Sequence, residues 1–152
     1  MSAAGPPGEP GAGAEPGPGA EPAPGAATRV SAAALRAAVD GYFAALAALD
    51  VEATVALFAP GATLECVTDG RSPRGHEELR AFFHGVVDGS RGMVHPVVWI
   101  AVDEAAGSVA TVQEYRDERD TGAVYEERTC NVFGFDGEGR ITRLRFWRGK
   151  RA

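Results

Sequence analysis

The sequence has few of the features that mark a disulfide scaffold, a membrane protein or a nucleic-acid binder. Its two cysteines, Cys66 and Cys130, are too few for a disulfide framework, although one bridge stays open, and they lack metal-ligand spacing. No apolar run approaches the roughly 20 residues of a membrane-spanning helix. The net charge is −6, and no basic stripe favours nucleic acid. We therefore expect a soluble, cytoplasmic protein with no membrane or nucleic-acid partner.

The first 28 residues contain almost no large apolar side chains. About half of this segment is proline or glycine, so nothing offsets the entropy lost on ordering, and we predict a disordered tail. It also lacks the basic and apolar regions of a secretory signal. The rest of the 152-residue chain, residues 29–149, has the length of one domain.

Periodicity predicts three helices and five strands in the order α-α-β-α-β-β-β-β. Ser31 and Asp50 are good N-caps for helices that follow directly, the second at 51–59, and a third helix is expected at 76–87. Period-2 patterns predict strands at 62–67, 93–103, 108–117, 123–136 and 140–148. The order indicates an α+β fold with the helices on one face of a strongly curved, mostly antiparallel sheet.

Two passages carry a family resemblance: YFAALAALDVEATVALFAPGATLECV at 42–67, and NVFGFDGEGRI near the end of the chain. With the RG and FF residues between them, they resemble the nuclear transport factor 2-like superfamily, which includes ketosteroid isomerases and SnoaL-like polyketide cyclases. The resemblance covers most of the chain after the tail. It implies a cone-shaped α+β domain with an apolar pocket, but not one function, since such folds carry many activities and non-enzymatic binders.

The oxygen-binding donors of ketosteroid isomerases fall on Tyr42 and Asn131 in this sequence. The resemblance implies that both hydrogen-bond a substrate oxygen, and the Asn amide donates without the large pKa shift that an Asp needs there. The alternatives are a core tyrosine with a satisfied hydroxyl and an asparagine that satisfies backbone groups.

The isomerase base is missing, because Cys66 stands where its Asp is expected and Glu65 should face the other side of the strand. Cys66 is either a thiolate or, as we favour, a small buried residue. Glu127, on the strand face of Asn131, is the first candidate for a replacement acid or base, and His95 is the second. Both could instead be ordinary surface residues.

The pocket is expected to bind a small apolar molecule, polyketide- or steroid-like, without a cofactor, and His76 and His84 have no third ligand for zinc. The residues expected to line it, besides the four candidates above, are Cys66, Phe82, Tyr115, Thr129, Phe133, Leu144 and Phe146.

The outward residues of the last strand, Arg143, Arg145 and Trp147, suit a homodimer contact, with plain solvent exposure as the alternative. The leading hypothesis is a cofactor-independent isomerase, cyclase or dehydratase acting by proton transfer. Its rival is a non-catalytic binding or dimerisation module.

Overall fold

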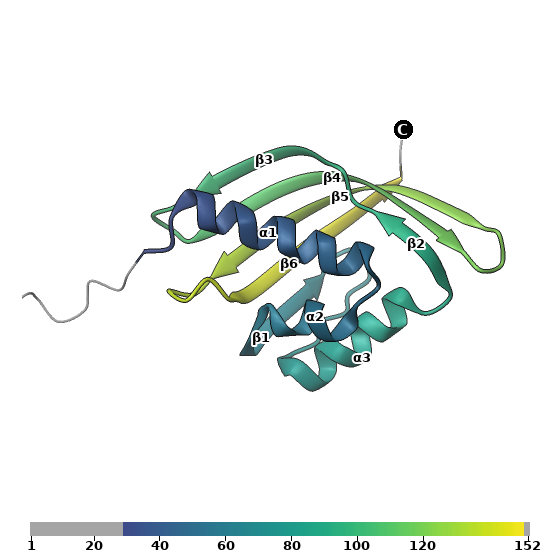
Figure 1. The fold of residues 1–152 in the computed structure, drawn as a ribbon, viewed down its shortest axis with the longest axis horizontal. Helices are drawn as coiled ribbons and strands as arrows, with labels where there is room; N and C mark the ends of the chain where they lie inside the picture. Colours follow the sequence, from purple (N-terminus) through teal and green to yellow (C-terminus); the bar gives the residue numbers. More distant parts are fainter. Residues whose placement is uncertain (1–28, 151–152) are drawn as a thin grey trace, which may run out of the picture.

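The computed structural model describes residues 29–150 of the chain, so the predicted disordered tail at 1–28 lies outside the described residues. Figure 1 shows the helices packed on one side of a curved sheet, which confirms the predicted α+β cone. No helix in the described part is long and apolar enough to cross a membrane. The elements are α1 (Ala32–Ala47), α2 (Val51–Ala56), β1 (Phe58–Cys66), α3 (Gly75–Val87), β2 (Ser90–Val94), β3 (Val97–Asp103), β4 (Ser108–Arg119), β5 (Val124–Phe135) and β6 (Ile141–Lys150).

Side-chain caps start the first two helices, as the sequence predicted. The Ser31 hydroxyl accepts from the Ala34 amide at 3.2 Å, and the Asp50 carboxylate accepts from the Ala53 amide at 2.9 Å. Helix α2 ends earlier than expected, at Ala56, because the chain turns to pair with β6. The Ile141 amide donates to the Leu57 carbonyl at 2.9 Å, and β1 begins at the next residue.

The sheet has the strand order β1-β6-β5-β4-β2, with β3 also paired to β4. Among the strand pairs of residues 29–150, only β1–β6 is parallel. The strand predicted at 93–103 is two strands, β2 and β3, which both pair antiparallel with β4. The break falls at His95 and Pro96, since proline has no N–H for the ladder, while its carbonyl still accepts from the Glu114 amide at 3.0 Å.

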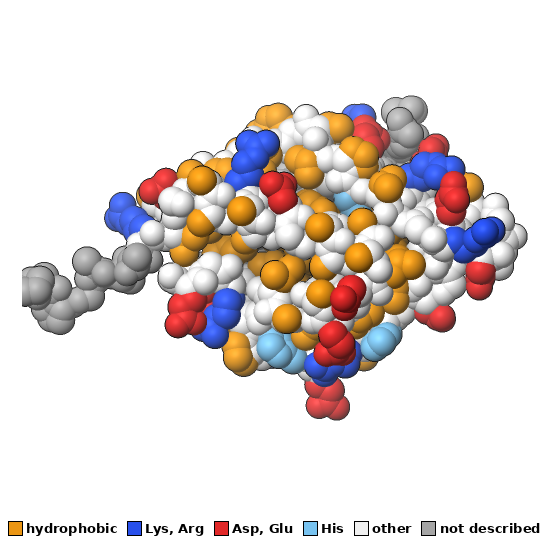
Figure 2. Space-filling view, viewed as in Figure 1, with side chains coloured by type: hydrophobic (Ala, Val, Ile, Leu, Met, Phe, Trp, Pro, Cys, Tyr) orange, Lys and Arg blue, Asp and Glu red, His pale blue; other side chains and the backbone are white. Residues whose placement is uncertain are grey.

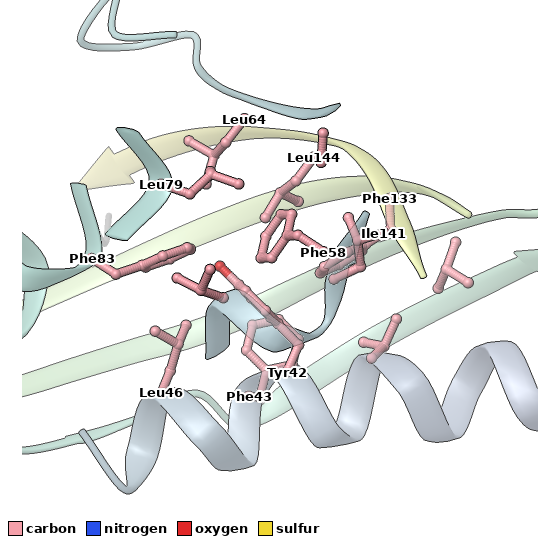
Figure 3. Close-up of a cluster of buried hydrophobic side chains, with 14 of the residues drawn as sticks. Tyr42, Phe43, Leu46, Phe58, Leu64, Leu79, Phe83, Phe133, Ile141 and Leu144 are labelled. Atoms are coloured by element: carbon pink, nitrogen blue, oxygen red, sulfur yellow. The ribbon is translucent and has the colours of Figure 1, made fainter. Parts of the chain in front are cut away.

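Helix α1 lies across the concave face of the sheet, and α2 and α3 lie beside β1 (Figure 1). On the face shown in Figure 2, apolar side chains spread over the middle and most charged side chains lie nearer the edges. The core between α1, α3 and the sheet is aromatic, with Tyr42 near its centre (Figure 3). Its largest fully buried side chains include Phe58, Phe83, Phe133, Leu64 and Leu144.

Truncation of Phe133 should be among the most damaging core changes. Phe133 is 0% exposed and contacts the rings of Tyr42, Phe43 and Phe135, so Phe133→Ala should lower the free energy of unfolding by about 3–5 kcal/mol. Urea unfolding measures the loss. Val98→Ala, at a side chain 56% exposed, is the control and should change stability by less than about 0.5 kcal/mol. Similar losses in both variants would contradict this description of the core.

Candidate functional site

The inner face of the sheet becomes more polar from one end to the other. Along the β4–β5 pair, the inward partners run from Val109 with Phe133, through Thr111 with Asn131 and Gln113 with Thr129, to Tyr115 with Glu127. Period-2 alternation places all of them on one face. The apolar end is packed into the core, so the polar end marks where a ligand can be held.

An inner cavity of about 90 Å³ lies between α1, α3 and the polar half of this face. Of the four candidate catalytic residues, Tyr42, Asn131 and His95 line it and Glu127 does not. Of the expected pocket residues, four line it. The full lining is Tyr42, Phe43, Leu46, Arg71, Phe82, Phe83, Val86, His95, Tyr115, Thr129, Asn131, Phe146 and Arg148.

Three expected pocket residues are packed elsewhere. Phe133 and Leu144 are 0% exposed within the core cluster, because the narrow end of the cone is filled with side chains. Cys66 is also 0% exposed and is absent from the cavity lining. Burial and a hydrogen bond with Asp69 raise the pKa of its thiol, which favours the neutral form and fits a small buried residue better than a thiolate.

Tyr42 reaches the cavity from α1 through a ring of aromatic neighbours. Its ring packs edge-on against Phe43, Phe58, Phe83 and Phe133 at centroid distances of 5.2 to 6.3 Å. Figure 3 shows its hydroxyl oxygen pointing away from α1 towards Phe83. None of the hydrogen bonds within the described residues involves this hydroxyl. Burial raises its pKa well above the usual value, so Tyr42 stays a protonated donor.

Asn131 is held by a buried network of amides and hydroxyls. Its Nδ2 donates to Gln113 Oε1 at 2.7 Å, and the same oxygen accepts from the Thr129 hydroxyl at 2.7 Å. Gln113 donates in turn to the Thr111 hydroxyl. Since Nδ2 carries two hydrogens, one remains for a group in the cavity. The network fixes the amide's direction, which favours a positioned donor over an asparagine that satisfies only backbone groups.

His95 faces the cavity from the break between β2 and β3. Its ring stacks on Phe43 at 5.4 Å and lies 5.0 Å from the ring of Tyr115, and within the described residues its buried Nδ1 has no hydrogen-bond partner. Burial disfavours the imidazolium and lowers the pKa of His95 to about 4, although the Asp117 carboxylate opposes this shift. His95 is therefore neutral near pH 7 and able to accept a proton.

Glu127 lies in a second, outer pocket of about 400 Å³ that adjoins the cavity. One of its oxygens is 3.8 Å from Arg148 Nε, and that oxygen is buried without a hydrogen bond in the described part of the chain. The outer pocket is otherwise lined by Arg71, Gly85, Val86, Tyr115, Asp117, Arg119, Tyr125 and Arg148. The first acid or base candidate thus stands outside the space that holds the two donors.

Sequence reasoning missed two arginines, Arg71 and Arg148, that line both the cavity and the outer pocket. Arg148 follows Phe146 by two residues in β6, so the alternation that places Phe146 inside also indicates Arg148. Arg71 lies in the loop after β1, where no periodic pattern predicts the direction of a side chain.

Comparison with known proteins identifies the family. Residues 39–144 match the model of the SnoaL-like domain. The chain belongs to the SnoaL-like domain family. This membership confirms the superfamily resemblance that the sequence predicted.

Solved structures show the same fold at low sequence identity. AusH from Aspergillus nidulans is 20% identical, with a TM-score of 0.71 over 80% of this chain and 88% of that one. The BvnE pinacolase from Penicillium brevicompactum is 17% identical, with a TM-score of 0.69 over 76% of this chain and 83% of that one. SalBIII is described as an epoxide hydrolase/cyclase-like enzyme in pyran ring formation in the polyether salinomycin. It is 22% identical, with a TM-score of 0.68 over 76% of this chain and 90% of that one. The search of curated proteins gave no match.

The protonation of His95 gives a direct test of this SnoaL-like site. In an NMR titration, its ring signals should show a midpoint near pH 4, and a midpoint near 6.5 would contradict a buried imidazole. Because the folded-state pKa is lower than the unfolded one, the unfolded chain binds more protons between these pH values. Stability from neutral His95 is complete above about pH 6.5 and is lost as the pH falls towards 4.

The same linkage can be measured by urea unfolding at several pH values. His95→Gln should flatten the dependence of unfolding free energy on pH between about 6.5 and 4, since the titrating group is gone. His84→Gln, at an exposed position in α3, is the matched control and should keep the wild-type slope. An unchanged slope in His95→Gln would contradict the assigned protonation.

Proposed function

We propose that this SnoaL-like domain binds a small, largely apolar carbonyl compound in the inner cavity and catalyses a proton transfer next to the carbonyl. The observation that carries the proposal is that two donors, Tyr42 and Asn131, and a neutral imidazole, His95, line one cavity with aromatic walls. Enolate-forming enzymes combine these elements: donors for a developing oxyanion and a base for the proton. The structural neighbour SalBIII, described as epoxide hydrolase/cyclase-like, supports the ring-closing form of this reaction.

The chemistry follows from the positions of the three groups. His95 takes a proton from the carbon beside the carbonyl, and the electrons of the C–H bond move to form an enolate. Tyr42 and Asn131 donate hydrogen bonds to its oxygen. In a β,γ-unsaturated ketone, return of the proton from His95 to the γ-carbon moves the double bond and isomerises the substrate. Attack of the enolate carbon on a second carbonyl of the same molecule closes a ring, and the new alkoxide takes the proton back from His95.

The low pKa of His95 makes it a weak base, so the two donors must supply much of the stabilisation. An enolate beside the ring raises the pKa of His95 during the reaction, because an adjacent negative charge favours the imidazolium. Glu127 is a second candidate for the proton only for a substrate that extends from the cavity into the outer pocket, which Glu127 lines.

Deuterium exchange tests the proposal without knowledge of the natural substrate. Cyclohexanone, acetophenone and larger ketones are incubated with the protein in D₂O, and NMR follows exchange at the carbons beside the carbonyl. The wild type should accelerate the exchange. Tyr42→Phe should lower the rate by about 100- to 1000-fold, because it removes one donor to the developing oxyanion.

The base has its own matched pair of variants in this assay. His95→Gln should lower exchange strongly, while His84→Gln, on the exposed surface of α3, should retain the wild-type rate. Exchange that is unaffected by Tyr42→Phe and His95→Gln would contradict the assigned roles. Ketone binding without accelerated exchange would favour the non-catalytic binding module, whose support in the structure is the small size of the cavity.

We also propose that two copies of the chain pair through the outer face of the sheet. Across four strands, the outward residues Trp99, Val112, Cys130 and Trp147 are consecutive pairing partners and form an apolar row. Trp99 is 54% exposed. Next to the row, Arg145 bonds Glu65 at 2.6 Å and lies 5.3 Å from the Trp147 ring, so its charge is partly balanced. Interface cores favour Trp and Arg in such surroundings.

Sedimentation equilibrium tests the pairing. The wild type should be a dimer at micromolar concentration, and Trp99→Asp should shift it towards monomer, because the carboxylate would be buried in an apolar interface. Ala81→Asp, on the exposed side of α3, is the control and should leave the dimer intact. A monomeric wild type would contradict the proposal.

A further inference from the structure

In the described part of the chain, the charged side chains that line the inner cavity are all positive. Arg71 and Arg148 line both the cavity and the outer pocket, so they stand where the two spaces meet. The carboxylates of Asp117 and Glu127 line the outer pocket only. A ligand that fills the cavity and extends outwards therefore meets two guanidinium groups first.

A carboxylate behind them holds the two arginines together. Asp69 Oδ2 accepts from Arg71 Nη2 at 3.0 Å and from Arg148 Nη2 at 2.5 Å, and Asp69 lines neither pocket. The guanidinium of Arg71 also lies 4.8 Å from the ring centre of Phe82. Each guanidinium has five N–H donors, so these bonds leave several of them for a ligand.

The other charged groups of the outer pocket differ in the strength of their ion pairs. Arg119 donates to Asp117 at 2.7 Å and also to the Asp88 carbonyl, so that pair is satisfied. Glu127 approaches Arg148 only to 3.8 Å, beyond hydrogen-bond distance. A ligand carboxylate that bonds Arg148 directly replaces a weak contact with a charge-assisted hydrogen bond.

We propose that the ligand of this cavity is an anion, a ketone that also carries a carboxylate, with the ketone at Tyr42 and Asn131 and the carboxylate at Arg71 and Arg148. The sheet register gives the distance between the two binding positions. Arg148 pairs with Thr129, which is two residues from Asn131 on the same face of β5, or about 7 Å along the strand. A short linker spans that distance. This inference rests on the proposed function, because it assumes that the ketone binds the two donors.

Calorimetric titration of matched ligands tests the inference. The probes are methyl ketones that end in a carboxylate, with one to six methylene groups between the two functions, each paired with its neutral methyl ester. At the best length the acid should bind about tenfold tighter than the ester, since only the acid makes charge-assisted hydrogen bonds. Arg71→Gln and Arg148→Gln should each bring this ratio close to one.

Control variants separate this contact from general electrostatics. Arg36→Gln removes the same charge at an exposed position of α1 that lines neither pocket, so the acid-to-ester ratio should not change. Tyr42→Phe should weaken acid and ester by the same factor and preserve the ratio. Circular dichroism verifies that each variant is folded, and Arg71→Gln alters a half-exposed side chain in a loop.

The outcomes distinguish the two claims. Equal binding of acid and ester overturns the anionic ligand and leaves the proposed function in place. A clear preference for the acid that depends on both arginines, without deuterium exchange of the bound ketone, supports the anion site and contradicts proton transfer. If neither acid nor ester binds at any length, both claims fail.

Discussion

The packing of the Tyr42 ring among four phenylalanine rings is the interaction on which the core and the candidate site both depend. Phe43 lies beside Tyr42 on α1, while Phe58, Phe83 and Phe133 come from β1, α3 and β5. Edge-to-face aromatic pairs add about 0.5–1.5 kcal/mol each beyond buried area. The same contacts that join the helices to the sheet also fix the direction of the Tyr42 hydroxyl. A position set by the core needs no further ordering when a ligand binds.

The polar end of the cone is built by the same alternation as its apolar end. Phe133 and Asn131 occupy successive inward positions of β5, so a small step along one strand changes the environment from core to cavity. Burial of an amide costs free energy unless the amide is hydrogen-bonded, and Gln113 accepts a hydrogen bond from the buried Asn131 amide. The network that satisfies these buried groups also orients the donor.

Most of the fold and about half of the site could be predicted from the sequence. The caps at Ser31 and Asp50 and the alternation of the strands depend on local chemistry, and local patterns report them well. The break at Pro96 was missed because the apolar pattern continues through it. The cone's taper depends on how side chains fill three-dimensional space, so no strand pattern shows that Leu144 is packed away from the cavity that Phe146 lines.

The placement of charge was the hardest feature to predict. Glu127 shares a strand face with Asn131, as expected, but the strand carries it beyond the cavity to the outer pocket. Arg71 reaches the cavity from a loop. The direction of its side chain depends on contacts with Asp69 and Phe82, which no periodic pattern in the sequence predicts. Alternation along a strand predicts the face of the sheet on which a side chain lies. Its depth along the cone depends on the register between strands.

A crystal structure of the protein with a bound ketone tests the central claim most directly. The account predicts that the ketone oxygen lies about 2.7–3.1 Å from both the Tyr42 hydroxyl and the Asn131 amide nitrogen, with an adjacent carbon facing His95. A ketone oxygen directed to the outer pocket, away from Tyr42 and Asn131, would contradict it.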